Sequence, residues 1–323
     1  MFAIDLSFFF DSLLIFGLAF LIDLIFGELP DRIHPTLLIG RVIAYFKPKI
    51  KSKNSRTEKM NGVLLGIFII MLVTVPVYFL IFLVHEFLGW APYIVVSAFI
   101  LSTTIAIKCM GQYTLPVAEA LENEDFDKAK DLLPFIVRRD PAALNKQHII
   151  SAAVETIAEG TTDGVTSPFF YFALFGVPGA ATFRVINTLD SMVGYKDQHH
   201  INIGWFSAKL DTTSNYIPAR LTAILMVVAA LLMNENWRKS WNIMQRDKKN
   251  TESLNAGWTL SAMAGALRIQ LEKPNFYKIG DKEEVSSTHI RRALRIMLLT
   301  TILFSIFIIL PILLAKTLII IIL

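Results

Sequence analysis

Residues 62–84 read GVLLGIFIIMLVTVPVYFLIFLV and contain no charged side chain. This stretch exceeds the roughly 20 apolar residues that cross a bilayer as a helix. The whole chain has the same character: 54% of its 323 residues are hydrophobic and 18% are charged, against about 45–50% and about 25% in soluble domains. The sequence therefore predicts an integral membrane protein. The single cysteine, Cys109, excludes a disulfide scaffold and a cysteine metal site.

The apolar residues gather in separate stretches along the chain. The first lacks a basic leader and a cleavage site, so we expect it to remain as an anchor. The last stretch runs on to residue 323 and is long enough for one span and a partial second pass after Pro311. We expect spans at about 7–27, 62–86, 92–107, 217–233 and 294–315.

A further apolar stretch, 165–183, is interrupted by Gly176, Pro178 and Gly179, which favours a re-entrant hairpin buried against protein. Strand-like alternation is absent, and the polar stretches show helical spacing. We therefore expect an all-α polytopic membrane protein, with about 4–6 membrane-inserted segments in a single domain over 1–323.

Charge placement gives an orientation in the cell membrane. Residues 41–61 hold seven Lys or Arg and one acid, Glu58, and short basic loops of this kind stay cytoplasmic. Residues 108–216 are net acidic and 235–293 net basic, yet one span at 217–233 cannot join two cytoplasmic regions. Either 165–183 also crosses or one of the two stretches only dips in; we favour two partial insertions. The polar regions expected on the active, cytoplasmic face are 108–164, 184–216 and 235–293.

One polar helix, 141–159, carries the clearest chemistry. Asp140 and Pro141 are typical of a helix start and Gly160 of its end. Glu155 and Glu159, four apart, share a face, and Asp163 follows in the turn 161–164. Hard oxygen ligands in a loose arrangement suit Mg²⁺, which keeps several waters and takes few carboxylates. A solvated helix face explains the same acids equally well.

Other charged groups lie near the expected membrane surface. Asp190 and Lys196 follow the apolar hairpin, and Asp211 precedes a polar run that ends at Arg220, one turn inside an apolar segment. Snorkelling to headgroups explains such an arginine, whereas ionisable groups at membrane depth are usually functional; we favour function slightly for Arg220 and for Asp23. No familiar nucleotide-binding or hydrolase motif is present. The residues alone indicate a membrane enzyme that handles a phosphorylated substrate with Mg²⁺.

These same blocks resemble the adenosylcobinamide-phosphate synthase family of cobalamin biosynthesis, whose members are integral membrane proteins. The resemblance covers roughly residues 20–297, and its most specific block is NTLDSMVGY at Asn187–Tyr195. The other matching blocks include DLIFGELP at 23–30, His34-Pro35, Arg139-Asp140, VETIAE at 154–159, Thr162–Gly164, Asp211, NYIPAR at 215–220, NAGW at 255–258, MAGAL at 263–267 and Pro274-Asn275. The chain departs from the family pattern at Arg138, Pro141, Gly160, Thr212 and Lys278–Gly280.

The resemblance implies an ATP-dependent ligase that forms a C–N amide bond. It joins adenosylcobyric acid to (R)-1-amino-2-propanol O-2-phosphate, or to a related amino-alcohol phosphate, and gives adenosylcobinamide phosphate. ATP and Mg²⁺ are the implied cofactors, and the lipid bilayer, other corrinoid-pathway enzymes and a second copy of the chain are the partners considered. No nucleic-acid partner is expected. The alternatives are a membrane transporter and a non-catalytic scaffold for corrinoid enzymes, the second kept open by Gly160 and Thr212.

Roles for single residues follow from this reaction. We expect either Asp190 or Asp211 to act as the base for the amine. The catalytic candidates are Asp190, Asp211, Lys196 and Arg220; those for substrate or phosphate are Arg139, Asn187, Asn215, Asn255 and Asn275; those for the metal are Glu155, Glu159 and Asp163.

Overall fold

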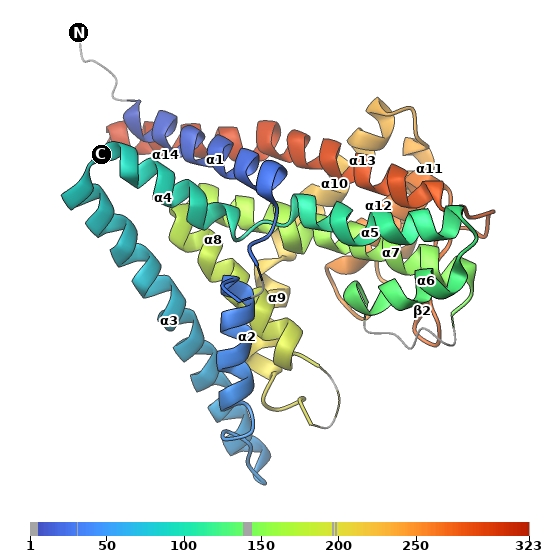
Figure 1. Cartoon of the computed structure of the whole chain (residues 1–323), viewed down its shortest axis with the longest axis horizontal. Helices are drawn as coiled ribbons and strands as arrows, with labels where there is room; N and C mark the ends of the chain where they lie inside the picture. Colours follow the sequence, from blue (N-terminus) through green and yellow to red (C-terminus); the bar gives the residue numbers. More distant parts are fainter. Residues whose placement is uncertain (1–5, 31, 138–143, 196, 198, 323) are drawn as a thin grey trace. The chain divides into compact units, whose positions relative to one another are not determined.

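The computed structural model describes residues 6–30, 32–137, 144–195, 197 and 199–322, and these are predominantly helical (Figure 1). By length and composition, five helices in this part of the chain can cross a membrane, or six if the bent pair α9 (Trp205–Ser214) and α10 (Tyr216–Leu232) is one span. The prediction of an all-α polytopic membrane protein is confirmed.

The chain folds into two compact units, although we expected a single domain. Unit 1 comprises residues 1–105, 167–214 and 308–323, and unit 2 comprises 106–166 and 215–307. The boundaries carry no linker composition. One boundary, at 166–167, falls within the uninterrupted helical run Lys146–Val193.

Unit 1 consists of long apolar helices. Its core is an apolar cluster in which Ile43, Ile69 and Leu189 are almost fully buried, and which joins α2, α3 and α8. On α1, Phe16 packs edge-on against Phe169 of α8, with ring centroids 4.6 Å apart. The elements are α1 (Ser7–Phe26), α2 (Pro35–Phe46), α3 (Ser55–Leu88), α4 (Trp90–Ser102), α8 (Ser167–Val193), α9 and α14 (Leu310–Ile322).

The longest helix, α3, contains the apolar run that opened the sequence. It begins where the Asn54 side chain accepts hydrogen bonds from the backbone N–H groups of Arg56 and Thr57, an N-cap that satisfies donors left open at a helix start. Only 11% of its most apolar window is buried. A helix so apolar and so little covered by protein suits contact with lipid.

The stretch expected to re-enter the membrane lies in α8. This helix bends at Gly176, whose φ of 68° and ψ of −163° lie outside the helical region, a conformation open mainly to glycine. Because α8 belongs to one of the five candidate spans, re-entry of 165–183 stays a prediction. Pro311 produces no break, since the π-helical turn η4 (Ser305–Ile309) leads directly into α14.

Unit 2 contains parts of three candidate spans together with shorter helices. Its elements are α5 (Ile107–Glu122), α6 (Phe126–Leu132), η1 (Leu133–Phe135), α7 (Lys146–Gly160), η3 (Thr161–Thr166), α10, α11 (Trp237–Asp247), α12 (Ala256–Leu267), β1 (Leu271–Lys273), β2 (Tyr277–Ile279) and α13 (Thr288–Phe304). β1 and β2 form a short antiparallel hairpin, although strand-like alternation is absent from the sequence. In the turn between β1 and β2, Pro274 precedes Asn275, whose φ is 66°, and the Phe276 N–H donates to the Lys273 carbonyl at 3.0 Å, as in a type II turn.

The predicted bounds of the acidic helix also need correction. Helix α7 begins at Lys146, and the Asn145 side chain caps it by accepting from the His148 N–H at 2.9 Å; Asp140 and Pro141 lie outside the described residues. Gly160 does not stop the chain from being helical. Residues 161–164, expected as a turn, belong to the π-helical turn η3, which leads into α8.

Helices α11 and α12 pack closely through two glycines. A Cβ placed on Gly257 would lie under 3.0 Å from the Lys248 carbonyl oxygen, and one on Gly265 would clash with the Lys239 carbonyl in the same way. Both obstacles are backbone atoms, which cannot swing aside as a flexible side chain does. The glycines within the NAGW and MAGAL blocks therefore have a packing role.

This packing predicts the effect of adding one methyl group. Gly265→Ala should destabilise the protein by about 1–3 kcal/mol, the usual cost of overpacking, and should lower the thermal midpoint followed by tryptophan fluorescence in detergent. Gly17→Ala is the matched control, because a Cβ there meets nothing within 4 Å and alanine is the better helix former. Equal midpoints for the two variants would contradict the close contact.

Candidate functional site

The predicted site residues divide between the two units. Arg139 and Lys196 lie outside the described residues. Unit 1 holds Asn187, Asp190 and Asp211, whereas unit 2 holds Glu155, Glu159, Asp163, Asn215, Arg220, Asn255 and Asn275. Each unit is therefore considered by itself.

Glu155 is a buried acid with partners on both carboxylate oxygens. The Ser151 hydroxyl donates to Oε1 at 2.5 Å, and the Tyr277 hydroxyl donates to Oε2 at 2.6 Å. The backbone N–H of Glu272 in turn donates to Ser151 Oγ at 2.6 Å. These bonds attach the β-hairpin to α7. A buried carboxylate needs such donors, so Glu155 has a structural role that the sequence did not reveal.

The other two metal candidates are more accessible. Glu159 is exposed at the end of α7, and Asp163 is half-buried in η3. No group of three or more His, Cys, Asp or Glu among the described residues is arranged to hold a metal ion. Mg²⁺ bound to a nucleotide takes only one or two carboxylates together with phosphate oxygens. Glu159 and Asp163 fit that smaller requirement, so the metal role stays a prediction.

Arg220 of unit 2 contacts two aromatic rings and donates two hydrogen bonds. Its guanidinium lies 3.5 Å from the ring centroid of Tyr216 and 5.0 Å from that of Trp258. Its Nη1 donates to Asn255 Oδ1 at 3.1 Å and to the Tyr216 carbonyl. The structure thus brings together Arg220 and Asn255, two residues that the sequence proposed separately.

The aromatic rings determine what this arginine can do. Both rings lie within cation–π distance of the guanidinium, while the edge of a guanidinium carries the N–H groups that bind phosphate. Lys248 adds a second cation, its Nζ 4.3 Å from the Trp258 centroid. Tyr216 and Trp258 stand in the matching blocks but were given no role from the sequence. Tyr216 precedes Arg220 by one helical turn, whereas only the fold places Trp258 and Lys248 nearby.

In unit 1, two candidates approach each other. Asn187 Nδ2 lies 3.4 Å from Asp211 Oδ1, which links α8 to α9. Asp190 is half-buried, and a Cβ on Gly194 would overlap its carboxylate.

The remaining candidates have local roles. Asn215 is buried at the start of α10, where its carbonyl accepts from the Ala219 N–H at 3.0 Å. Asn275 is exposed in the hairpin turn, where its positive φ suits asparagine. Of the departures, Thr212 bonds within its own helix to the Ala208 carbonyl at 2.7 Å, and a Cβ on Gly160 would meet the Met110 side chain. Arg138 and Pro141 lie outside the described residues.

The first motif block lines a pocket that sequence reasoning missed. A cavity of about 500 Å³ in unit 1 is bordered by Glu28, His34 and apolar side chains from α1 and α4. His34 also accepts from the Thr36 N–H at 3.2 Å and caps α2, with Pro35 in the first turn. The His-Pro pair thus has a structural explanation and also borders this cavity.

Comparison with known proteins gives the family of the chain. The family model described as CobD/Cbib protein matches residues 16–297. The chain belongs to the CobD/Cbib family. A "probable cobalamin biosynthesis protein CobD" of Methanothermobacter thermautotrophicus is 42% identical over 289 residues, which cover 89% of this chain and 94% of the relative.

Other members of the CobD/Cbib family are similarly close. The cobalamin biosynthesis protein CobD of Dehalococcoides mccartyi is 38% identical, over 84% of this chain and 87% of its own. That of Geobacter metallireducens is 39% identical, over 80% and 81%. No solved structure matches the chain. The protein has a role in cobalamin biosynthesis and is a multi-pass membrane protein.

The contact between Glu155 and Tyr277 predicts a stability effect. Tyr277→Phe removes the hydroxyl that donates to a buried carboxylate, which should cost about 1–3 kcal/mol and lower the thermal midpoint in detergent. Tyr45→Phe is the control, because Tyr45 is 61% exposed. A midpoint equal to that of the control would show that this bond does not stabilise the fold.

Proposed function

We propose that this protein is an adenosylcobinamide-phosphate synthase. It joins the free carboxyl group of adenosylcobyric acid to the amine of (R)-1-amino-2-propanol O-2-phosphate, or of a related amino-alcohol phosphate, with ATP as energy source. The observation that carries the proposal is membership of a family whose relatives are named for cobalamin biosynthesis. The motif blocks that resemble the synthase family, in order along the chain, support the specific reaction.

The chemistry sets what the protein must supply. At pH 7 a carboxylate and an ammonium group form a salt, so the carboxylate must first be activated. In the proposed route a carboxylate oxygen takes the γ-phosphoryl group of ATP and ADP leaves, giving an acyl phosphate. The amine then loses a proton to a base and its nitrogen attacks the acyl carbon, and inorganic phosphate leaves as the amide forms. These steps need cations at the phosphoryl group and a base near the amine.

The described residues support this assignment of roles. Arg220, held by Asn255 and two aromatic rings, is the cation we assign to a phosphoryl group. Asp190 or Asp211 serves as base, with Asn187 beside Asp211. Arg139 and Lys196 are assigned to substrate phosphate from the sequence alone, and Asn215 and Asn275 to substrate binding.

Glu159 at the end of α7 and Asp163 in η3, together with Glu155 four residues before Glu159, are the residues we assign to Mg²⁺. The ion would neutralise charge on the nucleotide phosphates. We place the reaction on the cytoplasmic face, where ATP is available and where the basic loop 41–61 favours retention.

A direct assay tests the reaction and its metal. Purified protein with adenosylcobyric acid, the amino-alcohol phosphate, ATP and Mg²⁺ should give adenosylcobinamide phosphate and ADP, measured by mass spectrometry, and removal of Mg²⁺ by chelation should stop it. Glu159→Gln should shift the Mg²⁺ dependence of turnover to higher concentration, whereas Glu284→Gln, an exposed acid in unit 2, should leave it unchanged. Absence of product from folded protein would refute the ligase and favour the scaffold.

Arg220 provides a separate test of the site. Arg220→Lys keeps the charge but loses the planar stack and the geometry of the Asn255 bond. If Arg220 contacts the transferring phosphoryl group, turnover should fall about 10²-fold or more; if it only grips the amine substrate, that KM should rise at unchanged kcat. Arg295→Lys, at an exposed position of α13, is the control. Wild-type kcat and KM for every substrate would remove Arg220 from the site.

A further inference from the structure

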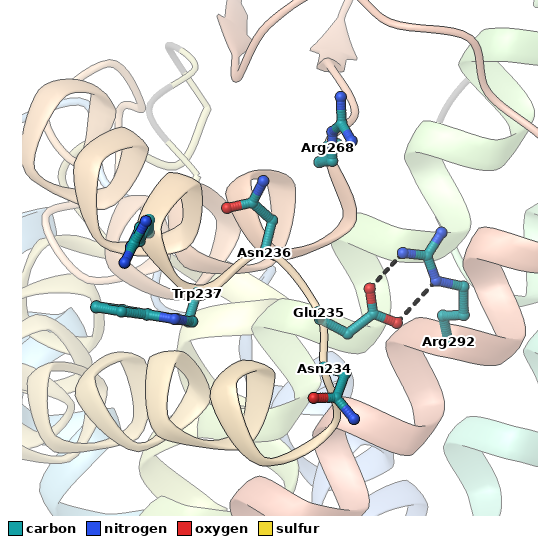
Figure 2. Close-up of a pocket in the computed structure, with 7 residues that line it drawn as sticks. Asn234, Glu235, Asn236, Trp237, Arg268 and Arg292 are labelled. Atoms are coloured by element: carbon teal, nitrogen blue, oxygen red, sulfur yellow. Dashed lines mark hydrogen bonds and ion pairs between the residues drawn. The ribbon is translucent and has the colours of Figure 1, made fainter.

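A second concentration of arginines lies in unit 2, at a pocket that the proposed reaction does not use. The pocket has a volume of about 410 Å³ and is lined by side chains from the turn after α10, the start of α11, the end of α12 and α13 (Figure 2). The lining residues are Asn234, Glu235, Asn236, Trp237, Arg238, Arg268 and Arg292. The lining carries three guanidinium groups and one carboxylate.

Arg292 is fixed in place by Glu235. Its Nε donates to Glu235 Oε1 at 2.8 Å, and its Nη2 donates to Oε2, so that the two planar groups meet side by side (Figure 2). The Glu235 side chain is 13% exposed and that of Arg292 is 34% exposed. This bidentate pair neutralises one positive charge and holds the arginine rigidly at the edge of the pocket.

Arg268 is placed by the end of α12. It adopts a left-handed conformation with φ of 59°, which ends the helix and directs the chain toward the β-hairpin. Its Nε lies 3.2 Å from Glu283 Oε2. Glu283 also accepts a hydrogen bond from Lys239, and the Lys239 bond followed by the charge of Arg268 lowers the pKa of this carboxyl below its usual value. Glu283 is therefore shared between Arg268 and Lys239, and Lys239 also lies 3.7 Å from Asp281.

Arg238 has no acidic partner among the described ion pairs. It is exposed, and its guanidinium carbon lies 5.4 Å from the centroid of Trp237. It also occupies the first turn of α11, a helix of 11 residues whose N-cap, Asn236, accepts from the Lys239 N–H at 2.9 Å. The positive end of the α11 dipole therefore adds to the charge of the arginines.

We propose that this arginine pocket binds the phosphate group of a phosphate monoester. Guanidinium groups match the oxygens of phosphate in pairs, and a dianion suits a lining with an excess of positive charge better than a monocarboxylate does. The volume is near the lower end of small-molecule pockets, about 300–1,000 Å³. Phosphatidic acid and soluble organophosphates both present this headgroup.

This pocket is distinct from the Arg220 cluster. Trp258, beside Arg220, lies in the first turn of α12, whereas Arg268 follows its last residue. At 1.5 Å per helical residue the two ends are about 15 Å apart. A small phosphate monoester does not bridge that distance, so a monoester bound in the arginine pocket does not reach the rings beside Arg220.

The test measures binding without ATP or corrinoid. The purified full-length protein, stripped of phospholipid in detergent, is titrated calorimetrically with glycerol 3-phosphate, which lacks the amine of the proposed substrate, and, as a phosphate-free control, with glycerol. We expect binding of the first only, weakened about tenfold or more in Arg238→Gln/Arg268→Gln. Arg295→Gln, on α13 but outside the pocket lining, should bind like the wild type. Arg292 is not substituted, because its removal would leave the Glu235 carboxylate without its ion-pair partner.

A second arm identifies the source of the phosphate. The protein is placed in phosphatidylcholine nanodiscs with or without phosphatidic acid, and the titration is repeated. If the wild type binds the soluble probe equally well in both kinds of disc, the ligand is a soluble monoester. If phosphatidic acid in the disc abolishes binding of the probe and phosphatidylglycerol does not, the pocket is occupied by a lipid headgroup. Equal affinity in the wild type and the double variant, or no binding of either probe, overturns the proposal. Ligase activity is not measured here, so its presence or absence leaves these outcomes unchanged.

Discussion

Within a bilayer every backbone N–H and C=O must find its partner inside the protein, and this requirement makes the apolar stretches helical. It also governs the irregular places. The bend at Gly176 occurs inside α8, and the π-helical turns η3 and η4 connect helices without an intervening loop. A π-helical turn preserves backbone hydrogen bonding while shifting the faces of the helix, and such turns are frequent at functional sites. Asp163 lies in η3, so its side chain does not follow the α-helical spacing of Glu155 and Glu159.

The same requirement explains which parts of the fold were predictable. The uncharged run 62–84 is unambiguous, and α3 covers it. The start of α7 was not, because Asp140 and Asn145 are both good capping residues and only the fold selects Asn145. The β-hairpin was not predicted, because strands of three residues are too short to show an alternation of apolar and polar residues. The division into two units was not predicted, because two of its boundaries, at 166–167 and 307–308, fall within helical runs.

Site residues were predictable where they are local and not where they depend on distant contacts. Spacing along α7 correctly placed the acids on one helix, but the partner of Glu155 is Tyr277, 122 residues further on. Arg220 and Asn255 were proposed from separate blocks, and their contact is tertiary. A motif block shared with the family does not show whether a residue serves packing or chemistry. Gly257 and Gly265 are constrained by the backbone of α11, whereas Arg220 combines rings, an amide and a charge.

The two arginine environments of unit 2 suit different tasks. The Arg220 guanidinium lies against the rings of Tyr216 and Trp258, and a charge–phosphate contact strengthens as the local dielectric falls. That setting favours a group on which charge develops during a reaction. Arg238 and Arg268 are instead largely exposed, so each contact there is weaker and several must act together. An open site of this kind suits the binding of a group whose charge does not change. The two environments lie at opposite ends of α12 and are therefore separate sites.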